Sequence, residues 1–206
     1  MAGHPGSLQI DVVWQHPVEA PRLPVSWLSA EEQAAELQRV QQRRAMDAAY
    51  EAELILGLAG QRPATADPKP GTPGARKPGW AVGEARDGVS EFFTAELATI
   101  LNLGRRTAGY RLDRAHTWLT KLPATFAALQ AGDLDERRAT QLAEVLMHTN
   151  ARIAGQVEAA LLPEAEGLSV YKLRDRATEL MLQLDAAAAD ERRQAAEKAA
   201  DVTVYP

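Results

Sequence analysis

The chain has no cysteine, few aromatic residues and no long apolar run. Cysteine is absent from its 206 residues, and aromatic residues make up 5% of them. Without thiols there is no disulfide framework and no thiolate metal site, so a reducing compartment suits the chain. No segment approaches the roughly 20 apolar residues that span a bilayer. Residues 1–17 also lack the basic start and apolar centre of a signal peptide. We therefore expect a soluble, cytoplasmic protein with no membrane association.

Helix-forming residues dominate what is present. Alanine supplies much of the 46% hydrophobic content, and Glu, Arg, Leu and Gln are abundant, which favours helix over sheet. The stretch LQIDVVW at residues 8–14 is one candidate strand, and one strand does not make a sheet. The composition predicts an all-α protein: a multi-helix bundle with an embedded helix-turn-helix, a long N-terminal helix and a Pro/Gly-rich linker.

Residues 1–28 are predicted to form an extended arm, because four prolines exclude a long helix there. These are Pro5, Pro17, Pro21 and Pro24. Trp14 and Trp27 have enough apolar surface to pin the arm onto a helical core. The alternative is that these two tryptophans contact a partner.

A long helix is predicted over residues 29–60. Ser29 and Glu32 match a capping box, in which the Ser29 hydroxyl accepts from the Glu32 amide and the Glu32 carboxylate reaches back. One face carries the apolar residues Leu37, Val40, Ala48, Ile55 and Leu58. Because the helix is longer than the usual 8–20 residues or so, it either packs within the domain, which we favour, or pairs with a second copy as a homodimer.

Proline and glycine dominate residues 61–88, where no apolar period survives. This composition is typical of a flexible linker or a long loop. Its basic side chains could contact an anionic partner such as DNA, although a merely solvated linker fits the same composition. They are Arg62, Lys69, Arg76 and Lys77.

Residues 89–201 are predicted to form the main helical domain. Its expected helices cover residues 90–101, 105–121, 124–131, 135–148, 152–165, 169–184 and 187–200. Pro123 marks one break, Gly132 suits a helix C-cap, and DLDE from Asp133 is a second capping box. Gly167 and Ser169 mark the next stop and start. The strand-like residues 202–206 are expected to begin a following segment that is truncated here.

The segment 94–115 has the layout of a helix-turn-helix. Ala98 is small enough to let two helices cross closely. Asn102 stands where the turn requires a left-handed backbone, and Gly104 is an acceptable N-cap for the second helix. The expected apolar joint between the helices consists of Leu101, Leu103, Ala108 and Leu112.

Four arginines fall within ten residues of this motif, although the formal net charge of the chain is -5. The stretch resembles the promoter-reading helix-turn-helix of sigma factors and related regulators. The matching residues are Glu96, Leu97, Ala98, Leu101, Arg105, Thr107, Arg111, Leu112, Arg114 and Ala115. The resemblance implies that the second helix enters the major groove of double-stranded DNA. The expected DNA-binding residues are Arg105, Arg106, Thr107, Tyr110, Arg111 and Arg114.

Arg105, Arg106, Gly109 and Tyr110 are expected to face the groove. Arg111 and Arg114 are expected to hold phosphates or to pair with acids such as Asp113. The acidity of the chain opposes loose electrostatic binding, so any affinity for DNA must be local. The alternative is a helical pair that uses this geometry only for packing, with solvated arginines.

Three further phrases resemble the N-terminal helical domain, of unknown function, of the actinobacterial 13E12 repeat family. They are LQRVQQRRAMDAAYEAELILGLA from Leu37, RLDRAHTWLTKLPATFAALQAGDLDERRATQLAEVL from Arg111, and ADERRQAAEKAADVTVYP at the end. The similarity spans about residues 31–206. It implies a helical fold, an actinobacterial source and a DNA-related role tied to mobile or repetitive elements. In that family the domain usually precedes an HNH endonuclease domain.

The residues of an HNH nuclease are missing from the sequence. Such a centre needs a histidine that activates water and further side chains that hold a divalent metal. The histidines here are His4, His16, His116 and His148. His148 ends an amphipathic helix without a ββα pattern, and His116 beside Trp118 suits packing. There is no phosphate-binding glycine loop and no nucleophile elbow. We expect no enzymatic activity, metal or cofactor.

The sequence thus favours a DNA-binding helical module. The alternatives are a protein-interaction or dimerisation module, an enzyme with an unrecognised centre, and a non-functional truncated remnant. An apolar stripe left exposed between Leu37 and Leu58 would favour an interaction module. A continuous basic face from Arg105 to Arg114 would favour DNA binding.

Overall fold

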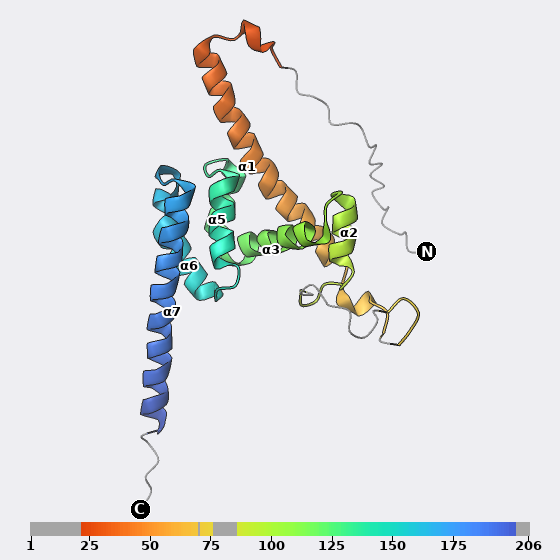
Figure 1. Cartoon of the computed structure of the whole chain (residues 1–206), viewed down its shortest axis with the longest axis vertical. Coiled ribbons are helices and arrows are strands. Elements are labelled where there is room, and N and C mark those ends of the chain that lie inside the picture. Colours follow the sequence, from red (N-terminus) through yellow and green to blue (C-terminus); the bar gives the residue numbers. More distant parts are fainter. Residues whose placement is uncertain (1–21, 70, 76–85, 201–206) are drawn as a thin grey trace, which may run out of the picture. The chain divides into compact units, whose positions relative to one another are not determined.

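The computed structural model describes residues 22–69, 71–75 and 86–200. Within these ranges the chain forms seven α-helices and three 3₁₀ helices, with no strand beyond an isolated bridge between Pro63 and Val89 (Figure 1). The predicted all-α bundle is confirmed. The elements are η1 (Val25–Trp27), α1 (Ala30–Gly60), η2 (Ala64–Ala66), α2 (Phe93–Ile100), α3 (Arg105–Lys121), α4 (Pro123–Ala131), α5 (Glu136–Leu146), α6 (Ala151–Leu161), η3 (Leu162–Gly167) and α7 (Val170–Ala200).

The chain divides into two compact units, Met1–Leu37 and Gln38–Pro206. In the described part of the first unit, η1 leads into α1. The predicted capping box is confirmed: the Glu32 amide donates to the Ser29 hydroxyl at 3.2 Å, and the Ser29 amide donates to the Glu32 carboxylate at 2.8 Å. Trp27 is 74% exposed, so it receives no support as a core anchor. Trp14 lies outside the described residues.

Helix α3 is the central helix of the second unit. It contacts α2, α4, α5 and α6, and Figure 1 shows it lying across the bundle with α2 near one end and α5 near the other. Ala108, Leu112, Ala115 and Trp118 line its buried face. The indole Nε1 of Trp118 donates to the carbonyl of Ala139 on α5 at 2.9 Å. This bond satisfies the one polar atom of a fully buried aromatic side chain.

Alanine forms most of the buried face of α1. The buried residues are Ala45, Ala48, Ala49, Ala52, Ile55 and Ala59. The predicted apolar face is therefore right at Ala48 and Ile55. It is wrong at Leu37, which is 66% exposed. The chain approaches α1 closely at the turn between α4 and α5, where a methyl group added to Gly132 would lie 3.2 Å from Cβ of Gln42.

The turn between α4 and α5 confirms one prediction and corrects another. Gly132 has φ 78°, and the Asp133 amide bonds back to the carbonyl of Ala128 at 2.9 Å, which closes the end of α4 as predicted. The second capping box is wrong. Asp133 belongs to the turn at Gly132, so α5 begins later and Asp135 is its N-cap. One carboxylate oxygen of Asp135 accepts from the amides of Arg137 and Arg138.

The C-terminal helices differ from the predicted spans. Pro163 lacks an amide hydrogen, so the helix expected over 152–165 becomes α6 followed by η3. Gly167 and Ser169 end one element and begin the next, as predicted, and the Lys172 amide donates to the Ser169 hydroxyl at 3.3 Å. The break expected between 184 and 187 is wrong. Residues 170–200 form one helix, since the alanine run at 186–189 has high helix propensity.

Both described ends of the predicted linker are held by side-chain contacts. Arg62 pairs with Glu96 of α2 at 2.7 Å, and this hydrogen bond raises the pKa of Arg62. The Asp67 carboxylate accepts from the Ser90 hydroxyl and from the Glu91 amide. Arg76 and Lys77 lie outside the described residues. Arg62 therefore already has an anionic partner within the fold.

None of the helices in the described ranges combines the length and the apolar character needed to cross a bilayer.

Candidate functional site

Helices α2 and α3 form a helix-turn-helix. Asn102 adopts φ 52°, the left-handed conformation predicted for it. Its amide donates to the Thr99 carbonyl at 3.3 Å, and the Leu103 amide donates to the Ala98 carbonyl at 2.9 Å. These two bonds are the pattern that closes a helix at a left-handed residue. Gly104 then takes the extended N-cap conformation of α3 and offers no side-chain cap.

The joint between the two helices is apolar, as expected. Ala98, Ala108 and Leu112 are buried, and Leu101 packs against the core while partly exposed. Leu103 is also half-buried. The motif is therefore a packed part of the bundle, which fixes the direction of α3.

The first turn of α3 holds three of the predicted DNA-binding residues on the surface. Arg105, Arg106 and Thr107 are exposed. None of the three side chains forms a hydrogen bond or ion pair with another residue in the described ranges. This turn therefore offers two guanidinium groups and a hydroxyl to solvent.

Arg111 and Arg114, one and two turns further along α3, are bound to carboxylates. Nη1 of Arg111 donates to Glu51 of α1 at 2.8 Å. Nη1 of Arg114 donates to Glu136 of α5 at 3.1 Å, and its Nη2 lies 3.7 Å from Glu51. The Arg114 side chain is only 11% exposed. Its guanidinium also lies 4.6 Å from the centroid of the Trp118 ring, a cation–π contact.

Tyr110 is likewise held by an acid. Its hydroxyl donates to Glu144 of α5 at 2.6 Å. Burial raises the pKa of Tyr110, and the hydrogen bond to Glu144 raises it further. Both effects favour the neutral phenol, so the hydroxyl stays a donor to this carboxylate.

The structure therefore separates the six predicted DNA-binding residues into two groups. Arg105, Arg106 and Thr107 are free on the surface, whereas Tyr110, Arg111 and Arg114 contact acids from α1 and α5. Sequence reasoning expected acids such as Asp113 as partners, but Asp113 pairs with Arg86 instead. The described part of the chain has no continuous basic face from Arg105 to Arg114.

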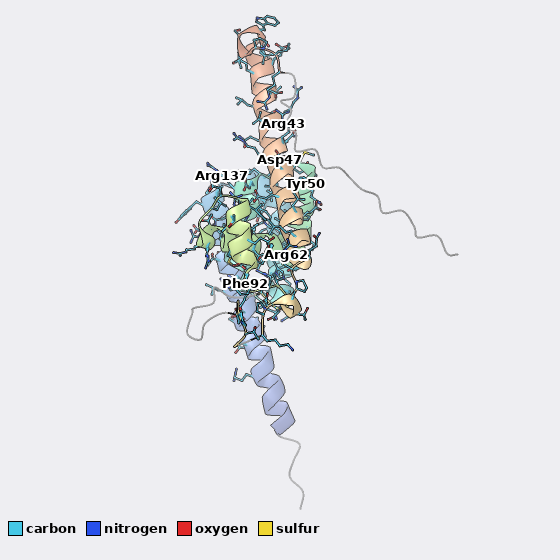
Figure 2. All side chains as sticks on the ribbon, turned by 90° about the vertical axis from the view of Figure 1, so that its right-hand side faces the viewer. Arg43, Asp47, Tyr50, Arg62, Phe92 and Arg137 are labelled. Atoms are coloured by element: carbon cyan, nitrogen blue, oxygen red, sulfur yellow. The ribbon has the colours of Figure 1, made fainter. Side chains whose placement is uncertain are left out.

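A second surface lies on the outward face of α1. Met46, Tyr50 and Leu54 are 48%, 60% and 54% exposed, and their spacing of four residues places them along one side of the helix. We call these three residues the α1 stripe. Figure 2 shows Arg43, Asp47 and Tyr50 following one another along α1, with charged side chains beside the tyrosine. The sequence predicts this helix as a possible dimerisation element, but the apolar face predicted for it consists of other residues.

No group of three or more His, Asp or Glu residues that could hold a metal ion occurs in the described ranges. His148 is exposed and His116 is half-buried. Neither histidine belongs to the α1 stripe or to the first turn of α3. His4 and His16 lie outside the part of the chain that the structure describes.

Comparison with family models, with curated proteins and with solved structures found no match for the chain. The resemblance to the 13E12 repeat family therefore stays a prediction.

Proposed function

We propose that the chain is a protein-interaction module that forms a homodimer through the α1 stripe. The observation that carries this proposal is the exposure of three large apolar side chains in a row on one helix. Contiguous exposed apolar surface of this kind is a feature of interaction sites, whereas single exposed apolar residues need no explanation. Arg43, Asp47 and Glu53 border the stripe and would form its polar rim.

The stripe is suited to a second copy because it is symmetric about Tyr50. Met46 and Leu54 lie four residues before and after it. When two α1 helices pack antiparallel across a two-fold axis at Tyr50, Tyr50 meets its own counterpart and Met46 meets Leu54. Each apolar side chain then contacts an apolar side chain, as a self-complementary interface requires. Gly57, one turn beyond Leu54, has open space around it and leaves room for the partner helix.

The arginine contacts support this choice over groove binding by the whole of α3. A DNA-binding face from Arg105 to Arg114 would need its arginines free, but Arg111 and Arg114 neutralise acids of the fold. Glu144 also lies against Tyr110, where a carboxylate would repel a phosphate backbone.

The test is the molar mass in solution, by light scattering after gel filtration, over a range of protein concentrations. We expect a dimer for the wild type and a monomer for Tyr50→Glu. The matched control is Tyr171→Glu, which places the same charge at a tyrosine on α7 that is 72% exposed. A monomeric wild type, or a Tyr50→Glu variant as dimeric as the control, would show the proposal to be wrong.

DNA binding through the first turn of α3 is the second candidate. It is favoured by the helix-turn-helix turn at Asn102 and by the free guanidinium groups of Arg105 and Arg106. In this candidate only the N-terminal turn of α3 contacts DNA. Its two arginines and Thr107 would bind phosphates or base edges. The DNA-related role implied by the 13E12 resemblance belongs to this candidate.

Fluorescence anisotropy with a labelled duplex across a salt series tests this second candidate. Binding that weakens steeply with salt and disappears in Arg105→Glu/Arg106→Glu would support it. The matched control is Arg137→Glu/Arg152→Glu, which changes the net charge equally at exposed arginines of α5 and α6. Equal loss of binding in both double variants would show only an effect of net charge and would count against a site on α3.

A further inference from the structure

A polar cavity of about 360 Å³ lies where the C-terminal half of α3 meets the end of α5 and the chain that leads into α2. Its volume is in the range of sites that hold small molecules. Basic side chains reach it from all three directions: Arg86 precedes α2, His116 and Lys121 belong to α3, and His148 follows α5. Neither the helix-turn-helix surface nor the α1 stripe includes these residues.

Arg86 lines this cavity and carries a positive charge. Its Nη2 donates to Asp113 of α3. Its Nε is buried and has no hydrogen-bond partner among the described residues. This Nε is closed to solvent, so a ligand would meet other parts of the Arg86 side chain, which lines the cavity. The Asp113 carboxylate is already engaged by the other end of the same guanidinium.

Lys121 has a donor to spare. Its ammonium donates to the backbone carbonyls of Met147 and, at 2.8 Å, of Thr149, which follow the last turn of α5. An ammonium has three N–H groups, so one is left for another acceptor.

His116 supplies a further donor through Nε2 only when its ring is doubly protonated, a state that a bound anion favours. The Thr120 hydroxyl gives its hydrogen to the His116 carbonyl at 2.7 Å, and its oxygen lies 3.2 Å from Nδ1 of the same histidine. Nδ1 must therefore carry a proton to complete this contact. Nε2 is left as an acceptor in the neutral ring and becomes a donor when the ring takes up a second proton.

The positive groups around the cavity repel one another. Burial lowers the pKa of His116, and the charges of Arg86 and Lys121 lower it further, while Asp113 acts in the opposite direction. Burial and Arg86 likewise lower the pKa of Lys121. Asp87, the other acid at the cavity, is exposed to solvent. A bound anion would offset this repulsion between the partly buried basic groups.

We propose that this cavity binds the phosphate group of a small molecule through Arg86, Lys121, His116 and His148. Phosphate fits better than a carboxylate, because its tetrahedral oxygens accept from donors that arrive from three different chain segments. The cavity has room for an organic group in addition to the phosphate. The ligand class is therefore a phosphomonoester, with free phosphate as the minimal form of the same chemistry.

Isothermal titration calorimetry at constant ionic strength tests this site, with inorganic phosphate, glycerol phosphate and phosphate-free glycerol as probes. We expect saturable binding of both phosphates and none of glycerol. We expect at least tenfold weaker binding by Lys121→Met and by His148→Gln. Arg105→Gln, at the opposite end of α3, should bind like the wild type. Tighter binding of glycerol phosphate would indicate a phosphomonoester, and equal binding would indicate free phosphate.

A nuclear magnetic resonance titration provides the second readout, because Lys121→Met also removes a bond to the end of α5. Phosphate should shift the ring signals of His116 and His148 in the wild type. His148→Gln changes an exposed side chain, so its fold should survive. Absence of saturable binding by the wild type would overturn the proposal. Wild-type affinity in His148→Gln together with unmoved histidine signals would overturn it too.

Discussion

The first turn of α3 and the turns that follow it carry the same kind of residue in opposite situations. Arg105 and Arg106 are exposed and make no polar side-chain contact within the described residues, whereas Arg111 and Arg114 bind acids of α1 and α5. The residue type is the same in the two regions, whereas the surrounding helices differ. A cluster of arginines in the sequence is therefore not by itself a basic surface. Substitutions in the two regions should therefore differ in their effect on the fold.

Arg114→Ala should have the largest effect. It removes the ion pair with Glu136, the bond to Thr140 and the contact over Trp118, and it leaves acids facing a vacated space. We expect the free energy of unfolding to fall by about 2–3 kcal/mol, since bonds to charged groups and their unpaired partners dominate the loss. Urea denaturation measures this change. A loss no larger than that of Arg105→Ala would contradict a structural role for Arg114.

Asn102→Ala tests the turn that joins the two regions. Asn102 has φ 52°, and alanine tolerates the left-handed conformation poorly. We expect a loss of about 1 kcal/mol in the free energy of unfolding. The control is Asn102→Gly, because glycine adopts this conformation without strain. Its free energy of unfolding should stay within about 0.3 kcal/mol of the wild type. Equal losses in both variants would show that the asparagine side chain matters, not the backbone angle.

Tyr110 and Glu144 predict a pH dependence in the second region. The pKa of Tyr110 is raised in the fold, whereas an unfolded tyrosine titrates near pH 10 or so. The folded state thus holds the phenolic proton more tightly. This contribution to stability is complete below the unfolded pKa and is lost as the pH rises through the folded one. Glu144→Gln should lower the pKa of Tyr110, measured by phenolate absorbance. An unchanged titration would contradict the bond to Glu144.

Arg105→Ala and Arg106→Ala should have the smallest effect on stability. Both side chains are solvated, so we expect changes within about 0.5 kcal/mol in the free energy of unfolding. Thermal or urea denaturation of each variant checks this. A loss of the size expected for Arg114→Ala would show that the first turn also supports the fold.

Short-range features of the fold could be predicted from the sequence. The capping box at Ser29, the left-handed turn at Asn102 and the break at Pro123 depend on residues that are close in the chain. Each of these features is determined by residues that lie within a few positions of one another in the chain. The expected break after residue 184 was wrong because no proline or glycine interrupts that alanine-rich stretch.

Partners from distant helices could not be predicted in this way. Glu51 reaches Arg111 across 60 residues of sequence, and Glu144 reaches Tyr110 across 34. Other acidic residues of the chain stand in similar local sequence. Only the packing of α1 and α5 against α3 determines that Glu51 and Glu144 are the partners. The α1 stripe was missed for a related reason. Five alanines and Ile55 form the buried face of α1, and this leaves Met46, Tyr50 and Leu54 outside.

The most direct test of the proposed dimer uses the absence of cysteine from the chain. Tyr50→Cys places a single thiol on the expected two-fold axis, where a symmetric antiparallel pair brings it against its own counterpart. Met46→Cys alone places two thiols about two helical turns apart in the same pair, or roughly 12 Å, beyond the reach of a disulfide. After mild oxidation we predict a covalent dimer for Tyr50→Cys and monomers for Met46→Cys on a denaturing gel. Monomers in both variants, or equal cross-linking of both, would contradict the account.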